Sequence, residues 1–115
     1  MNMIVMKKVS DISSQKNPHN VDARKIYETE HATAVVITLN PKESLKKHKT
    51  PVDVFFYVLE GTGVVEIGEE RQTASKDTIV DSPANIPHRW INESQGVFKV
   101  LVVKVPSPTT ETKLL

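Results

Sequence analysis

The sequence contains no cysteine. This absence excludes disulfide bonds, thiolate nucleophiles and cysteine-ligated zinc or iron–sulfur sites, so packing must hold the fold together. A Gly-x-Ser-x-Gly elbow is also missing, which leaves nucleophilic serine chemistry without support. No stretch has a useful helical period of apolar residues, and we therefore expect few or no helices.

The chain also lacks an excess of charge of one sign, with 15 lysines and arginines against 14 acidic residues. No basic cluster is dense enough to form a phosphate-binding face, so the sequence argues against nucleic acid as a partner. Residues 1–8 contain too short an apolar run for a signal peptide, and no stretch approaches the length of a membrane-spanning helix. We therefore expect a cytoplasmic protein that does not bind membranes.

What the sequence does contain is a series of short segments rich in β-branched and aromatic residues, separated by turn residues. This spacing predicts an all-β fold, a single antiparallel β-barrel, in one domain over residues 1–115. The barrel is expected at about 25–105, with 106–115 as a loose tail. The expected strands are 3–9, 25–29, 31–39, 52–59, 63–67, 71–74, 78–81, 86–92 and 97–105.

Two of these segments, 52–59 and 97–105, carry apolar side chains on both faces. A sheet with one solvated face would alternate with polar residues, so the second face needs its own cover. A second copy of the chain would provide that cover, which predicts a homodimer. The alternative is that the N-terminal strands of the same chain fold over this face.

Two stretches carry the most specific pattern. Residues 48–63 place a histidine before a β-favouring run that ends at Glu-Gly-Thr-Gly, and residues 82–92 place a second histidine, His88, after a proline-bounded turn. Together they resemble the two motifs of the cupin superfamily, which implies a double-stranded β-helix, or jelly roll. The agreement also covers seven further positions: Pro41, Leu59, Gly61, Asp77, Pro83, Pro87 and Asn92.

The resemblance implies a metal site in which two histidines and a glutamate of the first motif join the histidine of the second. Those positions are His48, Thr50, Val54 and His88 in this sequence. Only the first and last keep the family's residue type. A neutral hydroxyl is a weak ligand and valine is none, so the usual set of ligands is incomplete.

Two neutral imidazoles, His48 and His88, can still hold a divalent transition metal such as Zn, Ni, Cu, Fe or Mn, with weak affinity. Asp53 would complete the set if a bulge turned it inward, and His31 would do so from an adjacent strand. The ligand-binding residues expected in the barrel interior are His48, Thr50, Val54, His88 and Trp90.

Trp90 is in phase with His88, and it fits equally well as core or as a flat pocket wall. His19 falls in a turn-prone loop, where we expect it to be exposed. The basic run 46–49 would attract an anionic ligand to the barrel mouth.

Three glycine positions of the family pattern are occupied by Lys42, Lys76 and Asn85. Asparagine is the mildest of these changes, because it tolerates positive φ better than most residues. Asn92 is interpreted as a turn residue whose amide satisfies backbone groups.

Three classes of function remain open. The first is a protein that binds a small molecule in the barrel without catalysis, and the second is a metal-dependent oxygenase or isomerase using His48 and His88. The third is a structural or interaction module. The incomplete ligand set places binding ahead of catalysis, and whether the protein is an enzyme is left undecided.

Overall fold

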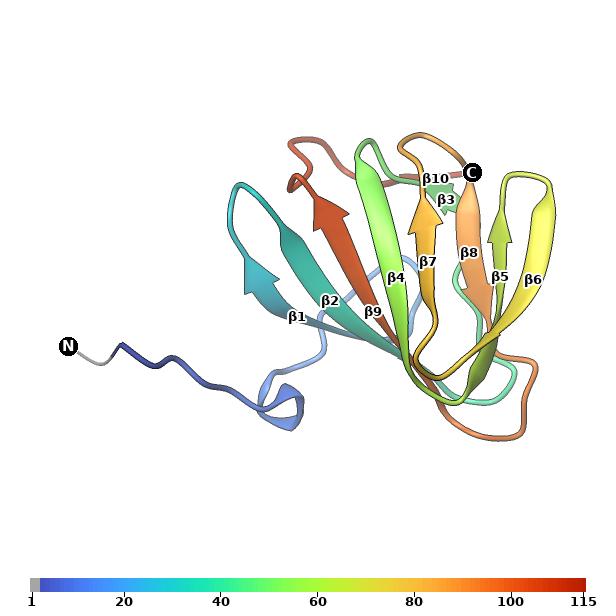
Figure 1. Ribbon diagram of the computed structural model, residues 1–115, viewed down its shortest axis with the longest axis horizontal. Helices are drawn as coiled ribbons and strands as arrows, with labels where there is room; N and C mark the ends of the chain where they lie inside the picture. The colour runs from blue at the N-terminus through green and yellow to red at the C-terminus, as the bar shows by residue number, and fades with distance from the viewer. Residues whose placement is uncertain (1–2) are drawn as a thin grey trace.

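The computed structural model describes residues 3–115 and contains ten strands and one short 3₁₀ helix (Figure 1). The helix, η1, spans Val9–Asp11. The strands are β1 (Asp22–Glu28), β2 (Thr33–Leu39), β3 (His48–Lys49), β4 (Asp53–Glu60), β5 (Thr62–Ile67), β6 (Glu70–Ser75), β7 (Ile79–Ser82), β8 (His88–Ile91), β9 (Phe98–Val105) and β10 (Lys113–Leu114).

The strands form two five-stranded sheets, in the orders β1-β2-β9-β4-β7 and β10-β3-β8-β5-β6. All pairs within them are antiparallel. This arrangement confirms the predicted all-β jelly roll, although the two sheets are not joined into one closed ring. Within the part of the chain that the structure describes, no helix is long and apolar enough to cross a membrane.

The core forms between the two sheets from alternate residues of each strand. In β4 the side chains of Val54, Phe56 and Val58 point inward and are buried. Phe98, Val100 and Val102 do the same in the neighbouring strand β9. The residues between them face outward and are partly exposed, so both faces are apolar as the sequence indicated. The homodimer inferred from that pattern stays a prediction.

The turn between β4 and β5 depends on glycine. Gly61 has φ +78°, and a Cβ there would lie 2.3 Å from the carbonyl oxygen of Val97. A side chain at Gly63 would meet the ring of Phe98 at 2.6 Å. Both positions therefore need glycine because the chain passes too close to its neighbours for a side chain.

Two positions where the family pattern has glycine do adopt the left-handed conformation. Lys42 has φ 73° and Asn85 has φ 64°. In the third case the positive φ lies on Asp77, at 68°, one residue after Lys76. Lys42 is therefore a strained residue, because in this region of φ/ψ space its Cβ lies too close to the following carbonyl oxygen.

Replacing Lys42 by glycine is expected to stabilise the protein. Relief of the left-handed strain exceeds the entropy lost by glycine by about 0.5 kcal/mol, which raises Tm by about 2–3 °C. Thermal unfolding followed by circular dichroism measures the change. Lys76→Gly is the matched control and should lower Tm, because Lys76 has no positive φ to relieve. Equal shifts in the two variants would contradict this explanation.

Asn92 takes the structural role that the sequence suggested. It is fully buried, and its Nδ2 donates to the carbonyl oxygens of Leu39 and Gly96, both at 2.9 Å. Its Oδ1 accepts from the backbone N–H of Ser94. The side chain therefore joins two loops at one end of the sheets, where no strand hydrogen bonds are available.

Two expectations at the chain ends were wrong. Residues 3–9 form no strand, because 3–8 form an exposed segment without regular secondary structure and Val9 begins η1. The last ten residues are not a loose tail throughout, because β10 pairs with β3 and Leu115 N–H donates to Lys47 O at 3.1 Å. The β propensity of these residues predicts neither result, because strand formation at a chain end depends on which sheet edges are free to pair.

Candidate functional site

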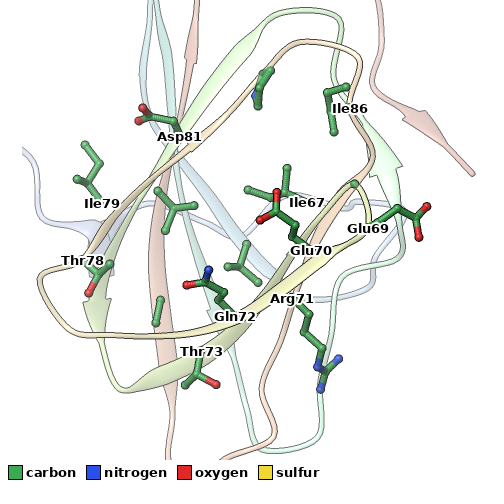
Figure 2. A pocket seen from close by; sticks show the side chains of 15 residues that line it. Ile67, Glu69, Glu70, Arg71, Gln72, Thr73, Thr78, Ile79, Asp81 and Ile86 are labelled. Atoms are coloured by element: carbon green, nitrogen blue, oxygen red, sulfur yellow. The ribbon is translucent and has the colours of Figure 1, made fainter.

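Two hollows are relevant to function. The larger, of about 680 Å³, lies between β6 and β7 and contains none of the site residues predicted from the sequence (Figure 2). The smaller, of about 300 Å³, lies inside the jelly roll and contains four of them. These four are His48, Thr50, Val54 and His88. The interior cavity is therefore the candidate site.

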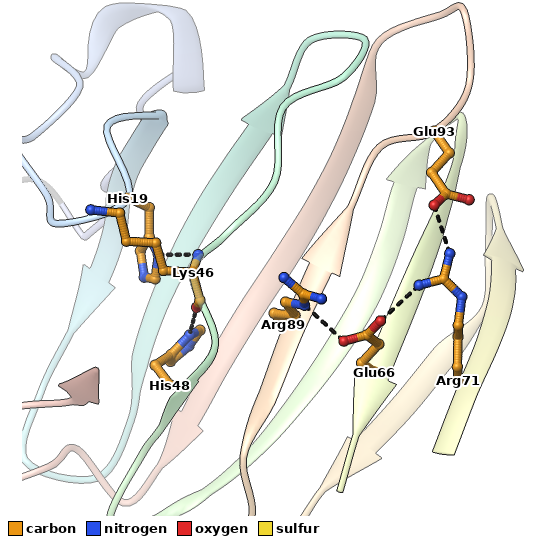
Figure 3. Close-up of polar contacts among 7 residues, drawn as sticks. All are labelled: His19, Lys46, His48, Glu66, Arg71, Arg89 and Glu93. Carbon is orange, nitrogen blue, oxygen red and sulfur yellow. Dashed lines mark hydrogen bonds and ion pairs between the residues drawn. The ribbon is translucent and has the colours of Figure 1, made fainter. Parts of the chain in front are cut away.

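Strand pairing brings the two predicted histidines together. His48 on β3 and His88 on β8 are cross-strand partners, and their ring centroids are 4.6 Å apart in an edge-to-face arrangement. The Nδ1 of His48 lies 2.7 Å from the carbonyl oxygen of Lys46 (Figure 3). Because a carbonyl only accepts, this nitrogen carries the proton and Nε2 keeps its lone pair.

A third imidazole, His19, joins this pair. Its ring centroid is 4.7 Å from that of His48, and its Nδ1 accepts a hydrogen bond from Lys46 N–H at 2.8 Å (Figure 3). The expectation that His19 is exposed was wrong, because it is half-buried and lines the cavity. Asn17 folds this loop by donating from Nδ2 to Val21 O at 2.7 Å. No sequence signal shows that the folded loop covers the barrel mouth.

The two remaining positions of the family's ligand set offer little to a metal. Thr50 is buried, and its hydroxyl lies 3.4 Å from Nε2 of His88. Ser82 Oγ lies 2.6 Å from the other ring nitrogen of His88, so both nitrogens have hydroxyl neighbours. Val54 lines the cavity with an apolar side chain.

Lysine side chains also reach the cavity. Lys104 on β9 pairs across the sheet with Thr33 and Val54, so it shares their inward face. Lys25 lines the cavity from β1, where its Nζ is 3.0 Å from Glu28 Oε2. Lys104 is not among the site residues predicted from the sequence. The alternation of strand residues would have indicated its inward position, because Lys104 follows Phe98, Val100 and Val102 in the same two-residue period.

Burial holds the cavity imidazoles neutral. It is the largest cause of the lowered pKa of His88, to about 3, with further lowering from His48, Lys104 and His19. The pKa of His19 is lowered to about 4, again chiefly by burial. Burial also lowers the pKa of His48, although the hydrogen bond to Lys46 opposes this shift. At neutral pH these rings are hydrogen-bonding groups without charge.

The pKa of Lys104 is lowered from its ordinary value by burial and then by the charge of Lys25. Among residues 3–115, Lys104 forms no ion pair with a carboxylate. A partly buried ammonium without an anionic partner is unfavourable, because desolvation of the charge is not offset.

Three other residues singled out in the sequence lie away from the histidine pair. Trp90 is fully buried in the core and is not among the residues lining the cavity. His31 is exposed, with its ring beside Glu30. Asp53 is exposed and accepts a hydrogen bond from Ala84 N–H at 2.9 Å. Neither the Asp53 nor the His31 alternative therefore completes a metal site.

The donors in the cavity do not fit a divalent metal ion. Within residues 3–115, no cluster of three or more histidine, aspartate or glutamate side chains has the geometry to hold one. His48 has one free lone pair, both nitrogens of His88 have hydroxyl neighbours, and the ammonium of Lys104 would repel a cation. Among residues 3–115, the carboxylate that lines the cavity is that of Glu28, and it is paired with Lys25, so it offsets little of the charge of an ion at the histidine pair.

Comparisons with known proteins agree with the fold. The family model described as a cupin domain matches residues 35–104. The crystal structure of TT1209 from Thermus thermophilus is similar at a TM-score of 0.75 and 28% identity, covering 88% of this chain and 96% of that chain. No curated protein matches the sequence.

Two further structures share the fold at lower sequence identity. A cupin 2 conserved barrel domain protein from Salinispora arenicola CNS-205 has a TM-score of 0.79 at 13% identity, with 92% of each chain covered. The polyketide cyclase RemF from Streptomyces resistomycificus has a TM-score of 0.83 at 15% identity, covering 98% of this chain and 86% of that chain. At such identities the likeness concerns the fold alone.

Proposed function

Since this chain belongs to the cupin domain family, whose model matches residues 35–104, we propose that its interior cavity binds a small organic anion. The single observation that carries this proposal is Lys104, an inward-facing cation beside three imidazoles with lowered pKa values. Lys25, the other cavity lysine, is already paired with Glu28. An anion bound at Lys104 would supply the missing opposite charge.

The cavity has two chemically different parts. The polar part contains Lys104 and the imidazoles of His19, His48 and His88. The apolar part is formed by Val35, Ile37, Leu45, Val54, Phe56 and Val102. A volume of about 300 Å³ suits a small ligand, with its anionic group at the lysine and its hydrocarbon part against the apolar wall.

The hydrogen bonds at the loop fix what each imidazole can offer a ligand. His19 Nδ1 accepts from Lys46 N–H, so the neutral ring carries its proton on Nε2 and can donate it. His48 is the opposite tautomer, and its Nε2 can accept. An organic anion with a carboxylate and a hydroxyl group would use both imidazoles, because the carboxylate can accept from His19 and the hydroxyl can donate to His48. The basic run 46–49 would favour entry of such an anion.

Removal of the Lys104 charge is expected to weaken anion binding at least about tenfold, a loss of about 1.4 kcal/mol or more, because the charged hydrogen bond is lost. The variants are Lys104→Met, which keeps the length, and Lys104→Arg, which keeps the charge. Lys99→Met is the matched control on the outward face of β9. The probes are aliphatic and aromatic monocarboxylates with their neutral amides, measured by calorimetry and thermal shift.

Results of two kinds would contradict the proposal. One is equal binding of acids and amides, or binding that Lys104→Met leaves unchanged. The other is stoichiometric metal that survives dialysis against a mild chelator and is lost in His48→Ala. That second result would favour a metal-dependent enzyme of the oxygenase or isomerase type instead.

A further inference from the structure

The N-terminal arm, residues 3–8, is an exposed apolar segment. It leaves the body of the protein beside η1 and extends away from both sheets (Figure 1). Met3, Ile4, Val5 and Met6 are 94%, 76%, 85% and 84% exposed. Four consecutive large apolar side chains in water are unfavourable, so a segment of this kind is expected to be covered by a partner.

The β6–β7 groove, defined as the hollow of about 680 Å³ between these strands, is a largely apolar surface at the other end of the molecule (Figure 1). Its apolar lining is Val65, Ile67, Ala74, Ile79, Val80 and Ile86. Both flanking strands, β6 and β7, are the last strands of their sheets. They therefore present unpaired backbone groups that an extended segment can bond.

Acidic side chains surround this apolar lining. Glu69, Glu70 and Asp81 line the groove (Figure 2). The basic side chain among them, Arg71, is already held by two carboxylates, with Glu66 at 2.7 Å and Glu93 at 2.6 Å (Figure 3). The groove thus combines an apolar floor with three carboxylates that form no ion pair among residues 3–115.

We propose that the N-terminal arm of one copy of this chain binds in the β6–β7 groove of a second copy. The apolar residues of the arm match the apolar lining of the groove. Lys7 and Lys8 follow them in the sequence and can pair with the acidic residues of the groove. Six residues in extended form span about 20 Å, which is the length of the six-residue strand β6. The arm therefore has the length and polarity of an added edge strand.

The arm does not reach the groove of its own chain. Its base is held at β1 by the hydrogen bond from Arg24 Nη1 to Val9 O at 3.2 Å. β7 lies at the opposite edge of that sheet, after β2, β9 and β4. Four strand spacings amount to about 19 Å, so the arm would be used up in crossing the sheet. The occupant must come from another molecule.

Cross-linking tests the contact directly, and the cysteine-free sequence gives a clean background. Chains carrying Val5→Cys are mixed with chains carrying Ile79→Cys and oxidised. We expect a mixed disulfide to form at least about tenfold faster than with the control Tyr27→Cys, an exposed residue on β1. Equal rates for the two mixtures would overturn the proposal.

Sedimentation velocity over a range of concentrations gives an independent test. Ile4→Asp combined with Val5→Asp should weaken self-association at least about tenfold, because two buried apolar contacts are lost. Lys7→Glu with Lys8→Glu should also weaken it, and mixing with Glu69→Lys plus Glu70→Lys chains should restore it. Lys16→Glu with Lys47→Glu gives the same charge change outside the arm and should have little effect.

Two sedimentation results would also overturn the inference. The first is a wild-type protein that stays monomeric at every concentration tested. The second is an oligomer that tolerates the arm substitutions but dissociates with Leu101→Asp, which would place the contact on the outer face of the β4–β9 sheet.

Discussion

Lowering the pH from 7 to 5 is expected to reduce the free energy of unfolding by about 2 kcal/mol through His88 alone. The pKa of His88 is about 3 in the folded protein, against 6.5 in the unfolded chain. Between pH 6.5 and pH 3, His88 is therefore protonated in the unfolded chain but stays neutral in the folded protein. Stability from this residue is complete above pH 6.5 and is lost as the pH falls toward 3.

His19 and His48 act in the same direction, because their pKa values are also lowered in the folded state. The interval from pH 7 to 5 isolates these imidazoles from the surface carboxylates. Glu66, for example, has its pKa lowered by Arg89 and affects stability only below its ordinary value of 4.5. Between pH 7 and 5 we therefore expect the loss of stability to arise from the cavity histidines.

Urea unfolding at pH 7, 6 and 5 measures this effect. In His88→Gln, which cannot titrate, the dependence of the unfolding free energy on pH should become shallower by about 1.4 kcal/mol per pH unit below pH 6. His31→Gln is the matched control, since that histidine is exposed. An unchanged slope in His88→Gln would show that the pKa of His88 is not lowered in the folded protein.

Truncating Trp90 to alanine is expected to destabilise the protein by about 3–5 kcal/mol. Its side chain is fully buried, with ring centroids 5.5 Å from Phe56 and 5.0 Å from Phe98. The loss combines apolar burial with the cavity left between the two sheets. If Trp90 were instead a wall of the ligand site, its removal would chiefly change binding.

Trp90→Phe is the informative companion. It keeps an aromatic ring and removes the indole Nε1, a buried atom without a hydrogen-bond partner in the described structure. We therefore expect a loss of about 1–2 kcal/mol, well below that of alanine. Urea unfolding must be followed by circular dichroism, because Trp90 is the single tryptophan. If Trp90→Ala had a small effect on stability but abolished anion binding, Trp90 would belong to the ligand site and not to the core.

The sequence by itself determined the central strands and the alternation of their faces. Alternation in 52–59 and 97–105 is a local property, because successive side chains of a strand point to opposite sides wherever the strand lies. The turn at Gly61 is equally local, since it follows from backbone conformation. The sequence also placed His48 and His88 in one interior, because the two motifs resemble those of the cupin superfamily, whereas their pairing across adjacent strands is seen only in the structure.

Only the tertiary structure decided which groups complete the cavity. His19 reaches His48 because the loop before β1 crosses the barrel mouth, and the path of a loop depends on contacts distant in sequence. The C-terminal residues behave likewise, since β10 forms where β3 leaves an edge open. Trp90 lies in the core, although alternation gives it the same face as His88. Period two defines the face of a strand, whereas depth along the barrel is set by how the two sheets pack.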